Sequence, residues 1–162
     1  MEASDHIAIE KLVNRYPYYL DAGMYDELGE LFAHADVYVG PNLVVSKDGP
    51  AVGALWRDSV KIYPNGTPRT RHLIVNLLVD DDGPDRARAH SSVLVVQDPR
   101  GGELKLLTAG DYLDTFEKVD GQWRFAERRV GNDLTGDLSD HTTVPMEPGG
   151  DLRPQRWEDG VR

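Results

Sequence analysis

The sequence predicts an α+β fold, a cone-shaped α+β barrel in which N-terminal helices pack on a strongly curved antiparallel sheet. Apolar residues recur at helical spacing over the first 63 residues and at strand spacing, between tight turns, over residues 69–130. The chain has 162 residues and 40% hydrophobic content, which suits one domain that buries its own core. The helices in the first part of the chain can therefore pack against the sheet formed by the later part.

Three helices are expected before the sheet. The first runs from about residue 4 to Gly23, and Pro17 inside it lacks an amide hydrogen, which predicts a kink or a tightened last turn. A short second helix covers residues 24–33, and a third starts at Asp48-Gly49-Pro50 and ends near residue 63. The faces expected to be buried comprise Ile9, Leu12, Val13, Tyr16 and Leu20 on the first helix, Leu28, Leu31 and Phe32 on the second, and Val52, Leu55, Trp56, Val60 and Tyr63 on the third.

The strands follow mainly after the helices. A brief strand at 36–39 and an edge strand at 43–46 interrupt the helices, and four longer strands separated by turns then form an antiparallel meander. Residues 1–131 are expected to form the domain, and residues 132–162, which lack periodicity, a tail or a lid in which only His141 is of chemical interest. The four meander strands are expected at 69–80, 86–97, 104–118 and 123–130.

The strand at 69–80 carries a histidine, the side chain that exchanges protons near neutral pH. Counting by twos places Thr70, His72, Ile74, Asn76 and Leu78 on one face. A histidine and an asparagine on an otherwise apolar face indicate a lined pocket as readily as an inert, hydrogen-bonded core histidine. The opposite face is apolar too. With no helix remaining to cover it, the sequence predicts a homodimer through the outer face of the sheet.

Composition narrows the classes of partner and cofactor. A formal net charge of -10 argues against nucleic acid or an anionic membrane as partner and favours a hydrophobic small-molecule substrate. No apolar run is long enough to span a bilayer and the polar start lacks a signal-peptide layout, so a cytoplasmic protein is expected. The chain has no cysteine, its five histidines are scattered, and it has neither a glycine-rich phosphate loop nor a nucleophile elbow. We therefore expect no metal and no cofactor.

The order of elements and several stretches resemble the nuclear-transport-factor-2-like superfamily, and within it the SnoaL-like polyketide cyclases, scytalone dehydratase and bile-acid dehydratases. The resemblance covers roughly residues 7–141. This superfamily also includes isomerases, epoxide hydrolases, dioxygenase small subunits and non-catalytic binders, so the likeness is more specific for fold than for activity. The stretches are Tyr16 with Leu20-Asp21-Ala22-Gly23, Arg69-Thr70-Arg71-His72, Gly110-Asp111-Tyr112-Leu113-Asp114, and Asp120-Gly121-Gln122-Trp123-Arg124-Phe125 with Arg128.

The resemblance to the dehydratases implies a site. It implies that Asp21 pairs with His72 and that Tyr16 helps to polarise the substrate. Those enzymes carry a further histidine or aspartate on the next strand, and the chain departs from them there, since it offers His90, Ser92, Val95 and Gln97 without a clear equivalent. Gly110, Tyr112 and Asp114 correspond to pocket-facing positions on the long strand. The residues expected to bind substrate are Tyr112, Asp114, Asn76 and Trp56.

A histidine beside a carboxylate is a workable acid-base pair, because the carboxylate fixes the tautomer and stabilises the imidazolium. The expected function is therefore a cofactor-independent lyase or cyclase acting on a polyketide-, steroid- or aromatic-like molecule. Each residue also has a structural explanation: Asp21 in a turn, Tyr16 in the core, and Asp114 paired with Arg128 or Arg124. A non-catalytic binding or accessory protein is the alternative, and an epoxide hydrolase or isomerase is less favoured.

Overall fold

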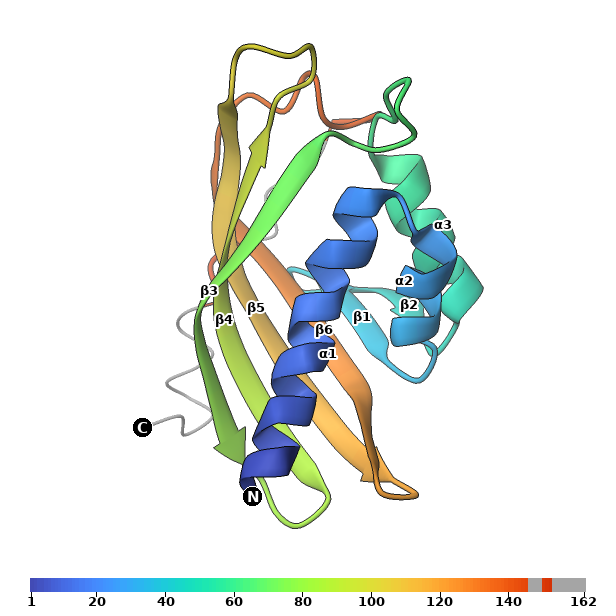
Figure 1. Cartoon of the computed structure of the whole chain (residues 1–162), viewed down its shortest axis with the longest axis vertical. Coiled ribbons are helices and arrows are strands. Elements are labelled where there is room, and N and C mark those ends of the chain that lie inside the picture. Colours follow the sequence, from blue (N-terminus) through green and yellow to red (C-terminus); the bar gives the residue numbers. More distant parts are fainter. Residues whose placement is uncertain (146–149, 153–162) are drawn as a thin grey trace.

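The computed structural model describes residues 1–145 and 150–152, and within them three helices lie against one side of a six-stranded curved sheet (Figure 1). This arrangement confirms the predicted α+β cone with its N-terminal helices. The longest helix, α1, crosses the concave side of the sheet, α2 packs beside α1 toward one end, and α3 packs beside α2 (Figure 1). Within the described ranges, no helix combines the length and apolar character needed to cross a bilayer.

The helices are α1 (Ala3–Ala22), α2 (Tyr25–Leu31) and α3 (Gly49–Ser59). Helix α1 continues through Pro17 and ends at Gly23, whose left-handed conformation (φ 72°) lets its amide donate to the last turn. The second and third helices are shorter than predicted. Helix α3 ends before residue 60 because the chain turns extended there and bridges to residue 142, far along the sequence.

The sheet has the order β2-β1-β6-β5-β4-β3. Strands β3 to β6 form the predicted antiparallel meander, whereas β1 pairs with β6 in parallel, a contact that a simple meander does not include. The last strand continues past residue 130, so the predicted domain boundary at residue 131 falls inside it. The strands are β1 (Asp36–Val39), β2 (Asn42–Ser46), β3 (Thr70–Asp81), β4 (Arg86–Gln97), β5 (Lys105–Val119) and β6 (Gln122–Thr135).

A bulge in β3 changes which residues face the helices. His72 and Ile74 face inward as predicted, but the pairing with β4 shifts between Val75 and Leu78. Asn76 lies in this bulge with φ 54° and is exposed. The extra residue reverses the alternation, so Leu78 emerges on the outer face with 55% of its surface exposed. The prediction that Asn76 and Leu78 share the inner face with His72 is therefore wrong.

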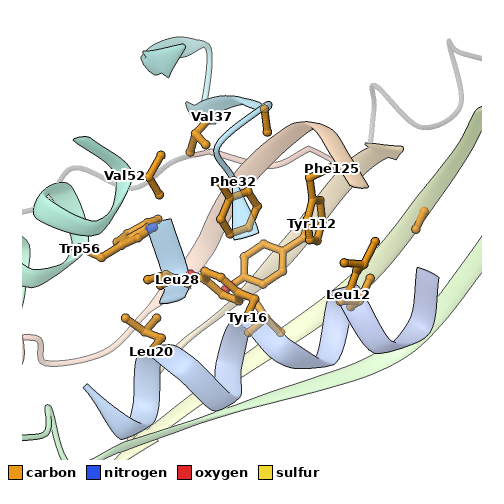
Figure 2. Close-up of a cluster of buried hydrophobic side chains, with 14 of the residues drawn as sticks. Leu12, Tyr16, Leu20, Leu28, Phe32, Val37, Val52, Trp56, Tyr112 and Phe125 are labelled. Atoms are coloured by element: carbon orange, nitrogen blue, oxygen red, sulfur yellow. The ribbon is translucent and has the colours of Figure 1, made fainter. Parts of the chain in front are cut away.

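The core lies between α1 and the concave side of the sheet and is built around aromatic rings. Figure 2 shows Tyr16 of α1 among Phe32, Trp56 and Tyr112. Its ring meets each of these three edge-on, with centroids 5.8, 6.4 and 5.6 Å away respectively, a favoured geometry for aromatic pairs. The predicted buried face of α1 is confirmed, since Ile9, Leu12, Val13, Tyr16 and Leu20 are all buried.

Candidate functional site

A cavity of about 80 Å³ lies between α1, the end of α3 and the inner face of the sheet. Its walls are mainly apolar, with a few polar groups reaching the same space, which is typical of small-molecule sites. Four predicted residues line it: Tyr16, His72, Trp56 and Tyr112. The apolar lining also includes Leu20, Val39, Val60, Val93, Val95, Val130 and Leu138, and the further polar lining includes Ser59, Thr70, Thr108, Asn132 and His141.

His72 and Asp21 form a buried pair at the wall of this cavity. Nδ1 of His72 lies 2.7 Å from Oδ1 of Asp21, and the His72 backbone N–H donates to Oδ2 at 2.8 Å. The hydroxyl of Thr70 donates to Oδ1 at 2.7 Å. An ionised carboxylate only accepts hydrogen bonds, so Nδ1 of His72 carries a proton and Nε2 is the nitrogen that can exchange one with a ligand.

Asp21 takes this position because α1 ends just after it, at Gly23, where β3 begins alongside. Burial of the carboxyl group works against its ionisation. The hydrogen bonds and charge of His72, together with the bond from Thr70, outweigh burial and lower the pKa of Asp21 below its ordinary value. The structure thus brings the two predicted residues together with the carboxylate charged at neutral pH.

Tyr16 and Tyr112 bring two phenol groups to the same cavity. Burial raises the pKa of Tyr16 and raises that of Tyr112 well above its ordinary value, so both phenols stay protonated. The Tyr16 ring also meets the His72 ring edge-on, with 6.1 Å between centroids. Protonated phenols donate hydrogen bonds but do not accept protons readily. Tyr16 is therefore suited to polarise a ligand oxygen, the role that the family resemblance implies.

Asp114 does not reach the cavity, because it is held in a buried ion pair with Arg128. The guanidinium donates to both carboxylate oxygens at 2.8 and 2.7 Å, and each side chain is only 1% exposed. Arg128 lies 4.4 Å from the ring centre of Tyr16 and 4.5 Å from that of Tyr112. The prediction that Asp114 binds substrate is wrong, and its alternative pairing with Arg128 is confirmed. Asn76, exposed in the β3 bulge, is not in the cavity lining either.

Residues 138–143, which we call the lid, cover one end of the cavity and belong to the segment predicted as a tail or lid. The lid hydrogen-bonds to the chain after α3, since the Lys61 amide donates to the His141 carbonyl at 2.7 Å. It is also held by the β4–β5 hairpin, where the Asp140 carboxylate lies 2.9 Å from Arg100 and 3.3 Å from Lys105. In Figure 1 this segment crosses from the end of β6 to the loop after α3. Sequence reasoning missed Leu138 and Asn132 as lining residues, because neither belongs to a periodic pattern.

The next strand supplies no histidine to the cavity. Nε2 of His90 lies 3.0 Å from the carboxylate of Asp111, to which the Ser92 hydroxyl also donates at 3.0 Å. Val93 and Val95 line the cavity, and strand alternation therefore places His90 on the opposite face. His141 of the lid is instead the second histidine that lines the cavity. Among the described residues, no group of three or more His, Cys, Asp or Glu side chains is arranged to hold a metal ion.

Comparison with known proteins gives a consistent picture of the fold. The sequence profile of the SnoaL-like domain matches residues 1–129. A provisionally assigned scytalone dehydratase from Novosphingobium aromaticivorans is 24% identical, with a TM-score of 0.70 over 92% of this chain and 93% of that one. A Mycobacterium tuberculosis protein of unknown function, Rv3472(D26N), is 26% identical, with a TM-score of 0.65 over 80% of this chain and 72% of that one.

A curated relative points toward a different kind of protein. The beta 2 subunit of the terminal oxygenase component of terephthalate 1,2-dioxygenase from Comamonas is 25% identical over 129 residues, which cover 72% of this chain and 82% of that subunit. The likeness therefore spans both enzymes and subunits of larger assemblies.

Proposed function

The chain belongs to the SnoaL-like family of the nuclear-transport-factor-2-like superfamily, and from that premise we propose that it is a cofactor-independent lyase or cyclase. Its substrate would be a polyketide-, steroid- or aromatic-like small molecule. The observation that carries this proposal is the buried pair of His72 with Asp21 at the wall of a largely apolar cavity. An apolar cavity excludes water and strengthens every charge interaction within it.

The pair supports removal of a proton from carbon. Nε2 of His72 takes the proton next to a substrate carbonyl, and the Asp21 carboxylate stabilises the imidazolium that forms. Tyr16 donates a hydrogen bond to a substrate oxygen. Where the substrate carries a β-hydroxyl group, the imidazolium returns its proton to the departing oxygen and the products are an alkene and water. Where the carbanion attacks another carbon of the same molecule, the product is a ring.

The closed lid implies that substrate entry needs movement. The cavity of about 80 Å³ is smaller than the roughly 300–1,000 Å³ that enclose a drug-sized ligand. The lid is attached by hydrogen bonds and surface ion pairs, which are easier to break than the packing of the helices. A polyketide- or steroid-sized substrate would therefore enter while the lid is moved away from the end of α3, and the lid would close again over the bound molecule.

Two measurements test the pair. Asp21→Asn should shift the tautomer of neutral His72 away from Nδ1–H, as read from the ¹⁵N resonances of its ring, because the carboxylate that accepts from Nδ1 is removed. Exchange of the methyl protons of acetophenone in D₂O should fall by about 100-fold or more in His72→Gln and in Asp21→Asn. His90→Gln alters a second His–Asp pair, on the other face of the sheet, and this variant should catalyse the exchange at the wild-type rate. Wild-type exchange rates in both His72→Gln and Asp21→Asn would exclude the proposed role.

A second candidate is a non-catalytic binding or accessory subunit. The observations favouring it are the likeness to a dioxygenase beta subunit and the position of His90 on the face opposite the cavity. It predicts that acetophenone or a larger aryl ketone raises the melting temperature of wild type and of His72→Gln alike, with no exchange in either protein. Exchange in wild type that His72→Gln abolishes would decide for the enzyme.

A further inference from the structure

His141 is the second histidine of the cavity, and it comes from the lid instead of the sheet. It lines the cavity together with His72. Its backbone is fixed on both sides, since its carbonyl accepts from the Lys61 amide at 2.7 Å and its amide donates to the Leu138 carbonyl at 2.8 Å. While the lid is closed, these bonds hold the Cα atom of His141 in place. A closed lid therefore presents two imidazoles to one ligand.

The two ring nitrogens of His141 differ in their surroundings. Nδ1 is enclosed by protein, and no residue within the described ranges forms a hydrogen bond with it. Buried N–H groups without an acceptor are rarer in proteins than buried acceptors without a donor. The neutral ring is therefore better accommodated with its proton on Nε2. This tautomer makes Nε2–H the polar group of His141 that a bound ligand can meet.

The charges around His141 keep the ring neutral. Burial is the main cause that lowers the pKa of His141 to about 4; a protonated His72 adds to the lowering, and the negative charge of Asp21 opposes it. Tyr16 and Tyr112, the phenols of the same cavity, are uncharged. The neighbouring carboxylate of Asp140 is engaged with the cations of the β4–β5 hairpin. At neutral pH the lid thus offers a hydrogen-bond donor that carries no charge.

We propose that His141 is a catalytic electrophile, whose Nε2–H bonds the carbonyl oxygen of the substrate while His72 removes a proton from the adjacent carbon. This inference rests on the proposed function. The C–H bond breaks, the proton goes to Nε2 of His72, and the electron pair moves onto the carbonyl oxygen as an enolate. When the enolate collapses, the carbonyl re-forms, the bond to a β-hydroxyl group breaks, and His72 returns the proton to that oxygen, giving water.

A neutral donor suits this step because it stabilises the enolate without protonating it. As His72 gains its proton, its positive charge further disfavours a second proton on His141, so the two imidazoles keep separate roles. A neutral histidine that polarises a carbonyl is an established device in enzymes, and loss of one such donor typically costs about 10²–10³ in rate. His141 thereby links lid closure to chemistry, since the donor is in place only when the lid is closed.

The test uses acetophenone labelled with ¹³C at its carbonyl carbon, because a hydrogen bond to the oxygen shifts that resonance downfield without any turnover. His141→Gln places an amide N–H near the position of Nε2, and His141→Phe keeps a ring of similar shape without a donor. The bound resonance should be shifted in wild type and in His141→Gln, and the shift should be lost in His141→Phe. Methyl-proton exchange should fall about 100-fold or more in His141→Phe and should be largely restored in His141→Gln.

The two readouts separate this inference from the proposed function. A shift that persists in His141→Phe, or no shift in wild type at saturating protein, overturns the role of His141. A carbonyl shift that depends on His141, without methyl-proton exchange in any variant, supports His141 as the hydrogen-bond donor but refutes the lyase or cyclase. If His141→Phe loses the hydrogen bond from the Lys61 amide, seen as rapid exchange of that amide proton, this variant no longer tests the donor alone. The test is then the comparison of wild type with His141→Gln and His141→Asn. His141→Asn carries its amide near the Nδ1 position and should lose the shift, and retention of it there would also overturn the proposal.

Discussion

Mild acid should destabilise this protein through one residue of the lid, His141. Its pKa in the folded protein is about 4, against an ordinary value of 6.5. Between these values the unfolded chain binds a proton that the folded chain excludes, so the free energy of unfolding falls as the pH is lowered through this window. Above pH 6.5 and below pH 4 the two states hold the same number of protons on this group, and the effect levels off.

The size of the effect follows from the same two values. A separation from 6.5 to about 4 corresponds to about 3 kcal/mol across the whole window, and about 2 kcal/mol of it is lost between pH 7 and pH 5. Carboxylates act in a different range. Asp21 has a lowered pKa, so the stability it contributes is present above its ordinary value and is lost only at more acidic pH. The contribution of His141 between pH 7 and pH 5 is therefore read as the difference between wild type and His141→Gln.

The assay is urea unfolding at pH 7 and pH 5 for wild type, His141→Gln and His34→Gln. His34 is an exposed histidine outside the lid, so His34→Gln controls for the loss of one histidine. Wild type and His34→Gln should each lose about 2 kcal/mol more than His141→Gln on acidification. The protection factor of the Lys61 amide, which bonds the His141 carbonyl, should also fall from pH 7 to pH 5 only where His141 is present. Equal losses in all three proteins would refute the reasoning.

Three further predictions concern the scaffold. Arg128→Met leaves the buried carboxylate of Asp114 unpaired, so urea unfolding should show a loss of about 3–5 kcal/mol that Asp114→Leu in the same chain largely restores; an unchanged midpoint would contradict this. Asn76→Gly should melt near the wild-type temperature while Asn76→Val loses about 1–2 kcal/mol, because φ is 54° there; equal melting would mean that the bulge is not needed. Leu78→Glu should convert the predicted homodimer to a monomer in light scattering, whereas Leu104→Glu, in the exposed hairpin, should not; a monomeric wild type would exclude the dimer.

Local patterns predicted the elements well wherever turns bounded them. Strand β4 runs over residues 86–97, as predicted, because an apolar β-branched run lies between two turn-forming segments. The ends of α3 and β6 were misplaced for a different reason. Helix α3 ends at Ser59 because the next residue bridges to Thr142, and β6 continues to Thr135 because the start of β5 pairs with it. The residues around each of these element ends do not indicate such contacts, because the contacting partners are distant in the sequence.

The site was predictable to the extent that it lies on regular elements. His72 was found from strand alternation, whereas Asp21 was found only through the family resemblance, since a helix end and a strand start meet only in the folded chain. Asn76 was misplaced because alternation was carried through a bulge. An asparagine inside an apolar strand was the available signal, because asparagine tolerates positive φ better than most residues. His141 was noted only for its place in an aperiodic tail, and its cavity contact depends on lid bonds that no pattern encodes.

The comparison of two His–Asp pairs shows what distinguishes a candidate site from an ordinary buried interaction. His72 and His90 are both largely buried and lie 2.7 and 3.0 Å from a carboxylate oxygen. The pairs use different ring nitrogens, Nδ1 in His72 and Nε2 in His90. They also differ in the face of the sheet: His72 faces the apolar cavity, Tyr16 and the lid, whereas His90 faces the opposite side. Since alternation in a strand reverses with a shift of one residue, the pairing of β3 with β4 decides which histidine can meet a ligand, and His90→Gln is the control that isolates this effect.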